Sequence, residues 1–138
     1  MIRVAAYQVT PKASFDKRKE QMHDALQKAD DERIDFICFP EGFLTGYYAQ
    51  ESLARETSLE INGDIFKGLL HEICRYRVTI IIGFNELAGS CLFDSVATIE
   101  KGNLLGIQRK HYLYHDYFTA GASYLCLQSK GLTQIDKI

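Results

Sequence analysis

Three short apolar runs alternate with two amphipathic stretches in the first 84 residues, and this alternation limits the possible folds more than any other feature. The runs are rich in β-branched and aromatic side chains, which favour strands, and they span Ile2–Val9, Asp35–Phe39 and Val78–Phe84. Strands that alternate with helices are typical of parallel β-α-β units. We therefore predict an α/β fold.

The two stretches between these runs have the period of amphipathic helices. In the first, which Ser14 can cap, the apolar residues are spaced i, i+3, i+4 and i+7: Met22, Ala25, Leu26 and Ala29. The second spans Asp64–Tyr76, and its apolar stripe consists of Ile65, Leu69, Leu70 and Ile73. Because each stretch has one apolar stripe, we expect both helices on one side of a sheet. We also expect the first strand to pair with the third.

The pattern changes in the second half of the chain. Leu92–Ile99 and Leu104–Gln108 flank a glycine-containing turn and predict a β-hairpin. Tyr124–Leu127 and Leu132–Ile138 predict a second hairpin. The α/β fold should therefore contain antiparallel as well as parallel strand pairs. Since the chain has no internal repeat and no linker, we expect a single domain over residues 1–138.

The composition argues against several classes of partner. Sixteen lysines and arginines against 18 acidic residues give a formal charge of −2, and the pI of about 6.1 provides no basic field for nucleic acid. The longest apolar run, Val78–Phe84, is far shorter than the roughly 18 residues of a membrane span. We therefore expect a cytoplasmic chain with no nucleic-acid and no membrane partner. The cysteines form no CxxC pair and are expected to be buried, reduced thiols: Cys38, Cys74, Cys91 and Cys126.

Two charged residues follow predicted strands directly, where sheets that alternate with helices place their ligand sites. Glu41 comes after Asp35–Phe39 and Pro40, which makes it a candidate base, although a loop glutamate is more commonly a solvated surface residue. Lys110 comes after Leu104–Gln108 and is likewise more commonly plain surface. The aromatic residues after it could exclude water from its ammonium group: Tyr112, Tyr114, Tyr117 and Phe118.

Metal and nucleotide sites have weaker support. His111 and His115 have the i, i+4 spacing of helical zinc ligands, but the tyrosines between them and the nearby glycine favour a loop. The segment Gly83–Gly89 lacks the Gly-Lys-Ser/Thr ending of a phosphate-binding loop. We therefore expect no metal and no cofactor.

Glu41, Lys110 and their surroundings together resemble the nitrilase, or carbon-nitrogen hydrolase, superfamily. The opening RVAAYQVTP is similar to the first strand of that family, and DFICFPEGFLTGY is similar to its glutamate motif. The segments VTIIIGFNEL and LFDSVATIEKGNLLG are similar to the strands that follow in that family. The segment IQRKHYL, together with FTAG, is similar to the family's lysine motif. The resemblance extends from about Arg3 to Thr133. It implies a partial nitrilase-like α-β-β-α sandwich with mixed parallel and antiparallel sheets.

The resemblance also implies a reaction and a role for each residue. A cysteine thiolate would attack a small-molecule amide or nitrile, with Glu41 as general base and Lys110 as the cation that stabilises the tetrahedral intermediates. The family commonly associates through packed sandwiches, so a homo-oligomer is one expected state. The identity of the substrate stays open, because in this family it depends largely on loops and on the half of the fold that follows.

The chain departs from the family at two points. The nucleophile motif, which resembles ICYD, normally follows the strand that begins at Leu132, but the sequence there reads KGLTQIDKI and stops at Ile138. The family's second glutamate is not found between Lys110 and Gly121, where Asp116 is the only carboxylate, and whether Asp116 replaces it stays open. We therefore expect a truncated domain that is inactive as this chain. The alternative is a non-catalytic remnant that acts as a binding or subunit-interaction module.

Overall fold

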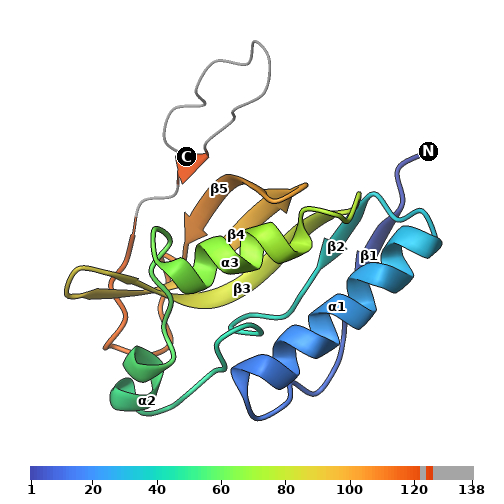
Figure 1. The fold of residues 1–138 in the computed structure, drawn as a ribbon. Coiled ribbons are helices and arrows are strands. Elements are labelled where there is room, and N and C mark those ends of the chain that lie inside the picture. Colours follow the sequence, from blue (N-terminus) through green and yellow to red (C-terminus); the bar gives the residue numbers. More distant parts are fainter. Residues whose placement is uncertain (122–123, 126–138) are drawn as a thin grey trace.

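The computed structural model describes residues 1–121 and 124–125, and within them it contains one sheet with the strand order β1-β2-β3-β4-β5-β6 (Figure 1). The first three strands are parallel and the remaining pairs are antiparallel, which confirms the predicted α/β fold with both kinds of pairing. The strands are β1 (Val4–Ala6), β2 (Phe36–Cys38), β3 (Thr79–Ala88), β4 (Cys91–Glu100), β5 (Asn103–Arg109) and β6 (Tyr124–Leu125).

The predicted pairing of the first strand with the third is wrong, because β2 lies between them. Ala5 is paired with Ile37, and Ile37 is paired in turn with Ile80. Both connecting helices lie on the same face of the sheet, so each right-handed crossover moves the chain one strand further in the same direction. Consecutive parallel strands therefore become neighbours.

The first predicted helix is confirmed as α1 (Phe15–Asp31). The Ser14 hydroxyl accepts a hydrogen bond from the Lys17 backbone N–H at 3.3 Å, and the four residues of the predicted stripe are buried. These residues pack in the same core cluster as Ile37, Ile80 and Ile82 of the sheet. The helix is thus held by the apolar face that its sequence predicts.

The second predicted helix forms as α3 (Asp64–Ile73), but its apolar stripe is partly different from the prediction. Leu69 and Ile73 are buried as expected, whereas Ile65 is 62% exposed and Phe66 is fully buried. The Phe66 ring packs on Phe84 of β3, with 5.4 Å between ring centroids. Because an aromatic ring buries more area than an isoleucine, this contact determines the rotation of the helix. A short helix, α2 (Glu51–Glu56), was not predicted.

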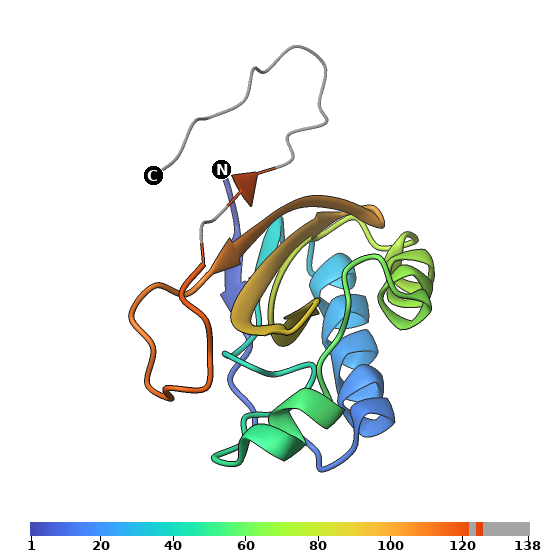
Figure 2. The same ribbon diagram turned by 90° about the vertical axis from the view of Figure 1, so that its left-hand side faces the viewer.

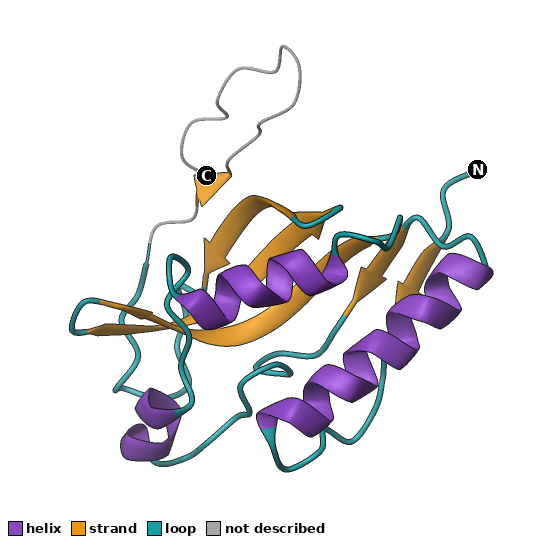
Figure 3. Ribbon diagram, viewed as in Figure 1, coloured by secondary structure: helices purple, strands orange, loops and turns teal. Residues whose placement is uncertain are grey.

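The two longer helices cover one face of the sheet and leave the other to loops. Figures 2 and 3 show α1 and α3 on the same side, while the segment after β5 extends from the opposite side. Ala97, Ile99 and Ile107 belong to the core beneath the helices, so the residues that alternate with them, including Val96 and Gln108, point away from it. None of the described helices is long and apolar enough to cross a membrane.

The predicted second hairpin and the four cysteines are only partly covered by the described residues. Of the predicted second hairpin, only β6 is described, paired antiparallel with β5. The expectation of buried cysteines is wrong for Cys74, which is exposed, and for Cys38 and Cys91, which are partly exposed. Cys74 directly follows Ile73, the last residue of α3, and belongs to neither core cluster. Cys126 lies outside the described residues.

Candidate active site

Glu41 lies in a loop that is tied to strand β3 by its own backbone. The Leu44 N–H donates to the Gly83 carbonyl at 3.0 Å, and the Asn85 N–H donates to the Thr45 hydroxyl at 2.8 Å. Phe43, Leu44 and Thr45 are fully buried, which is unusual for a loop. Gly42 and Gly46 adopt the left-handed backbone that the turns of this loop require, with φ of 59° and 97°. The position of Glu41 is therefore fixed by the tertiary structure.

Arg18 of α1 ties the same loop to the helix layer. Its guanidinium group is almost completely buried and donates to the carbonyl oxygens of Leu44 at 3.0 Å and Thr45 at 2.9 Å. It also donates to the carbonyls of Lys12 and Ala13, which precede α1. The sequence analysis did not identify Arg18, because an arginine in a helix rich in charged residues is usually solvated. Its position within the apolar stripe, four residues before Met22, was the available signal.

Gly83 allows the loop to approach the sheet closely. A Cβ atom at this position would lie 2.7 Å from the Pro40 oxygen and the Gly42 nitrogen, and 2.9 Å from the Glu41 Cα. All three are backbone atoms of the loop, so the loop itself would have to move. Gly83 therefore determines how closely Glu41 can approach the face of the sheet.

We expect Gly83→Ala to displace the Glu41 loop and to lower the free energy of unfolding by about 1–3 kcal/mol, as overpacking in a tight core does. Urea unfolding measures the loss, and a changed NMR environment of the Lys110 ammonium group reports the displacement. Gly68→Ala is the matched control, since a Cβ atom there meets nothing within 4 Å and alanine favours the α3 helix by up to about 1 kcal/mol. Equal stability of both variants would contradict the proposed role of Gly83.

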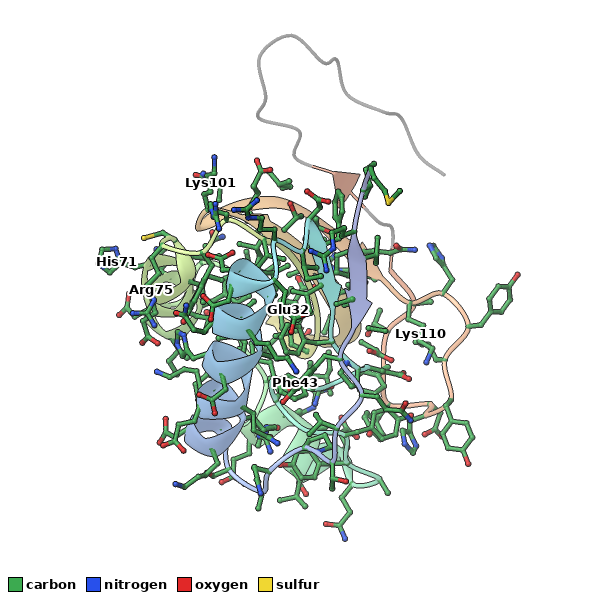
Figure 4. The ribbon with its side chains drawn as sticks, turned by 90° about the vertical axis from the view of Figure 1, so that its right-hand side faces the viewer. Glu32, Phe43, His71, Arg75, Lys101 and Lys110 are labelled. Atoms are coloured by element: carbon green, nitrogen blue, oxygen red, sulfur yellow. The ribbon has the colours of Figure 1, made fainter. Side chains whose placement is uncertain are left out.

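Lys110 follows strand β5, whose end is held by a buried ion pair. Glu86 of β3 accepts hydrogen bonds from the Ser95 hydroxyl at 2.7 Å and from Arg109 Nε at 2.9 Å. The Arg109 guanidinium group also lies over the Phe93 ring, 3.9 Å from its centroid. The Lys110 N–H then donates to the Asp94 carbonyl at 2.9 Å, which continues the β4–β5 ladder. These contacts bring the lysine to the face of the sheet that the helices leave uncovered (Figure 4).

The two residues singled out by the sequence analysis meet at this face. The Lys110 ammonium group forms an ion pair with the Glu41 carboxylate, although 69 residues separate them in the chain. The tertiary structure therefore brings these two side chains together. Together with Asp94, Val96 and Gln108 they line a cavity of about 340 Å³, which is large enough for a small ligand.

Asp94 is a third titratable residue of this cavity, and it was not predicted from the sequence. Its side chain is almost fully buried, and its Oδ2 lies 3.4 Å from the Lys110 Nζ. Within the apolar strand sequence LFDSVATI, an acidic residue that alternates with Val96 and Thr98 was the signal that could have identified it. Two carboxyl groups therefore surround one ammonium group.

Burial and these neighbours shift the acidities of all three groups. Burial, followed by the hydrogen bond and the charge of Glu41, raises the pKa of Asp94 to about 7. The hydrogen bond from Asp94, and then the contact with Lys110, lowers the pKa of Glu41 although partial burial opposes this. The hydrogen bond to Glu41 raises the pKa of Lys110. At neutral pH the cavity therefore holds an ionised Glu41, a charged Lys110 and an Asp94 that is close to half-protonated.

We expect Asp94→Asn to stabilise the protein more at pH 8 than at pH 5. Folded Asp94 keeps its proton up to about pH 7, whereas unfolded Asp94 loses it near its ordinary value of 3.8, so its contribution to stability is lost as the pH rises through this window. Asparagine has no such proton to lose. The gain in free energy of unfolding should be larger at pH 8 by about 1–3 kcal/mol, measured by urea unfolding. Exposed Asp116→Asn is the control, and a gain independent of pH would contradict the prediction.

The expected aromatic wall around Lys110 forms only in part. Tyr112 and Tyr114 are exposed, at 94% and 83%, so the expectation is wrong for both of them. Tyr117 is half-buried, donates a hydrogen bond to the Tyr48 carbonyl and stacks on His115 with ring centroids 5.0 Å apart. Tyr47 also contacts His115, with ring centroids 5.4 Å apart. Burial and the Glu41 charge raise the pKa of Tyr47.

The described histidine, cysteine and Asp116 candidates predicted from the sequence lie outside the cavity lining. His115 packs between tyrosine rings, and the described residues contain no group of three or more side chains suited to a metal ion. Asp116 is exposed and does not line the cavity, so the second carboxylate beside Lys110 is supplied by Asp94. None of the cysteines in residues 1–121 lines the cavity either.

Comparisons with known proteins show which proteins this chain is similar to. The carbon-nitrogen hydrolase family model matches residues 3–131. A glutamine-dependent NAD(+) synthetase of Thermotoga maritima is 27% identical over 110 residues, which are 79% of this chain and 19% of the relative. A probable nitrilase of Schizosaccharomyces pombe is 27% identical over 120 residues, 80% of this chain and 43% of the relative. This chain thus spans about a fifth to two fifths of the length of these relatives.

The fold is also found among solved structures. The crystal structure of a carbon-nitrogen hydrolase from Helicobacter pylori matches 87% of this chain and 45% of its own chain, with a TM-score of 0.72 and 21% identity. At this identity the match establishes the fold alone. The helices, the mixed sheet and the segments that carry Glu41 and Lys110 all lie within the 129 residues that the family model covers.

Proposed function

Because this chain belongs to the carbon-nitrogen hydrolase family, we propose that it provides the base and the cation of a site that hydrolyses a small amide or nitrile. The observation that carries the proposal is the ion pair between Glu41 and Lys110, which joins two distant motifs at a cavity of about 340 Å³. Neither residue is needed there for the core, since Glu41 and Lys110 both keep more than a third of their side chains exposed. A charged pair at the mouth of a pocket suits a reaction better than it suits stability.

Each residue has a defined task in this proposal. Glu41 accepts the proton of a cysteine thiol, and the thiolate attacks the carbonyl or nitrile carbon of the substrate. Lys110 donates hydrogen bonds to the negative charge that develops on the former carbonyl oxygen or nitrile nitrogen. For an amide, Glu41 returns the thiol's proton to the nitrogen of the tetrahedral intermediate, which expels ammonia and leaves a thioester. Water, deprotonated by Glu41, then hydrolyses the thioester to the acid and restores the thiol.

We assign the thiol to the family's cysteine motif, because no described cysteine lines the cavity. We therefore expect the chain alone to release no ammonia from small amides or nitriles. A version that carries the family's cysteine motif should release it. Activity of the 138-residue chain that disappears in Cys126→Ala would instead identify a resident cysteine as the nucleophile.

The test of the proposal does not need the natural substrate. Iodoacetamide is a small amide-bearing electrophile, and its reaction rate with the motif cysteine measures how well that thiol is deprotonated. In the version with the cysteine motif, Glu41→Gln should slow alkylation and ammonia release at least tenfold, while Glu60→Gln, an exposed glutamate on the surface, should change neither. Equal alkylation rates in the Glu41→Gln variant and the parent would overturn the role of Glu41.

A second function is favoured by the cavity lining, which contains no cysteine among the described residues. A cavity with a base and a cation but no described nucleophile can bind an amide without turning it over, as a non-catalytic binding or subunit-interaction module would. NMR titration of the chain with acetamide and propionamide, monitored at Lys110, tests this function. Binding combined with an inert cysteine-motif version would favour the binding module over the hydrolase.

A further inference from the structure

The cavity contains one more acidic side chain than a base-and-cation pair requires. Asp94 enters it from β4, Glu41 from the loop after β2, and Lys110 from the end of β5. The carboxyl groups of Asp94 and Glu41 both contact the Lys110 ammonium group. One ammonium group balances the charge of one carboxylate, and the burial of Asp94 makes a second negative charge beside Glu41 unfavourable. The arrangement therefore favours one proton on the pair.

We propose that Asp94 and Glu41 share a single proton beside Lys110, and that Asp94 is the positioning residue that sets when Glu41 can accept a proton from the nucleophile. The first part of this inference stands on the geometry of the three side chains, and the second part rests on the proposed function. Asp94 holds the shared proton because it is 6% exposed, whereas Glu41 is nearly half exposed and its charge is solvated.

The pair explains how a glutamate of lowered pKa can serve as a base. A thiol has an ordinary pKa near 8.5, so its proton transfer to a lone carboxylate with a pKa at or below 4.5 is unfavourable by a factor of about 10,000 or more in the equilibrium constant. Transfer to a pair that gives up its last proton near pH 7 is unfavourable by a factor of only about 30. When both groups are ionised, one proton leaves the sulfur and binds a Glu41 oxygen. The pair returns to its singly protonated state, and the sulfur becomes a thiolate.

The other groups around the pair do not replace this proton. The residue opposite Asp94 on β3 is Asn85, which is neutral and donates to the Gly46 carbonyl. The Glu86–Arg109 ion pair projects from the other face, since Ser95 and Arg109 alternate with Asp94 and Lys110. From the loops, the titratable groups that face the pair are Tyr47, His115 and Tyr117. Lys110 is thus the one lasting positive charge among the described groups that contact the two carboxyls.

The test is a carbon-13 NMR titration of the side-chain carboxyl groups in the 138-residue chain from pH 3 to pH 9. In the parent, the Asp94 signal should titrate near pH 7, and the Glu41 signal should show a second inflection at the same pH. In Glu41→Gln, the Asp94 midpoint should fall by one pH unit or more, because Lys110 then faces Asp94 alone. In Asp94→Asn, Glu41 should lose the inflection near pH 7.

Two controls separate a shared proton from simple burial. Lys110→Met should move the Asp94 midpoint upward, and Asp116→Asn, which alters an exposed carboxylate of the next loop, should move neither signal. An Asp94 midpoint below pH 5 in the parent would overturn the proposal. So would an Asp94 midpoint that is the same in the parent and in Glu41→Gln, since burial alone would then account for it.

The positioning role has its own readout in the version that carries the cysteine motif. The rate of thiol alkylation should rise with an inflection near pH 7 in the parent, and Asp94→Asn should remove that inflection and lower the rate at pH 8 about tenfold or more. An unchanged pH profile in Asp94→Asn would overturn the positioning role. Failure of the proposed hydrolase is a separate result, because it would appear as alkylation that is independent of Glu41 while the carboxyl titrations remain as described.

Discussion

Replacing Lys110 with methionine should lower ammonia release at least 100-fold in the version of the protein that carries the cysteine motif. The methionine keeps the length of the side chain but removes the donor that faces the developing negative charge, and loss of one such donor commonly costs about 100-fold to 1,000-fold in rate. The change also leaves Glu41 and Asp94 without the cation that both contact. Initial rates of ammonia release over a panel of small amides and nitriles measure the effect.

Lys67→Met is the matched control for this prediction, because Lys67 is an exposed lysine of α3 on the opposite side of the sheet from the cavity. Its rate should equal that of the parent. Circular dichroism of both variants checks that the fold is unchanged. If Lys110→Met keeps more than a tenth of the parental rate, Lys110 does not stabilise the intermediates and the proposed reaction fails at its second residue.

Replacing Arg18 with methionine should lower the free energy of unfolding by about 3–5 kcal/mol. The guanidinium group donates to four backbone carbonyls, and those of Leu44 and Thr45 lie in the buried part of the Glu41 loop. Each buried carbonyl left without a donor costs about 1–3 kcal/mol, and methionine fills the volume without supplying one. Thermal unfolding should show a Tm lower by roughly 10 °C or more.

Lys28→Met on the same helix provides the comparison, since the Lys28 side chain is 78% exposed and its ion pair with Glu32 spans 3.9 Å. A change within about 0.5 kcal/mol is expected there. The Arg18 variant should also lose the close contact between Glu41 and Lys110, because its loop is released. Similar Tm values for the two variants would show that the loop is held without Arg18.

The local structure could be predicted from the sequence where one short segment determines it. The stripe of α1, the cap at Ser14 and the β4–β5 hairpin follow from residue spacing within ten to twenty positions, and the structure confirms them. The rotation of α3 was predicted incorrectly because Ile65 and Phe66 are both apolar neighbours in the sequence. The contact of Phe66 with Phe84, eighteen residues away, decided between them.

The candidate site divides in the same way. Glu41 and Lys110 were found because each directly follows a predicted strand, a position that the local pattern marks. Asp94, Arg18 and Gly83 were missed because their roles depend on which backbone comes to lie against them. An aspartate in a strand, an arginine in a helix and a glycine before a phenylalanine carry no local sign of such contacts.

By itself, the sequence determined the α/β class, the family resemblance and the two charged residues that meet at the cavity. Periodicity and strand-end position act over a few residues, so they survive without knowledge of the fold. The tertiary structure alone decided that β2 separates β1 from β3, that Arg18 holds the Glu41 loop and that Asp94 shares the cavity with Lys110. These features depend on burial and on contacts between distant segments. Only packing brings the Asp94 carboxyl group of β4 within 3.4 Å of the Lys110 ammonium group, which follows β5.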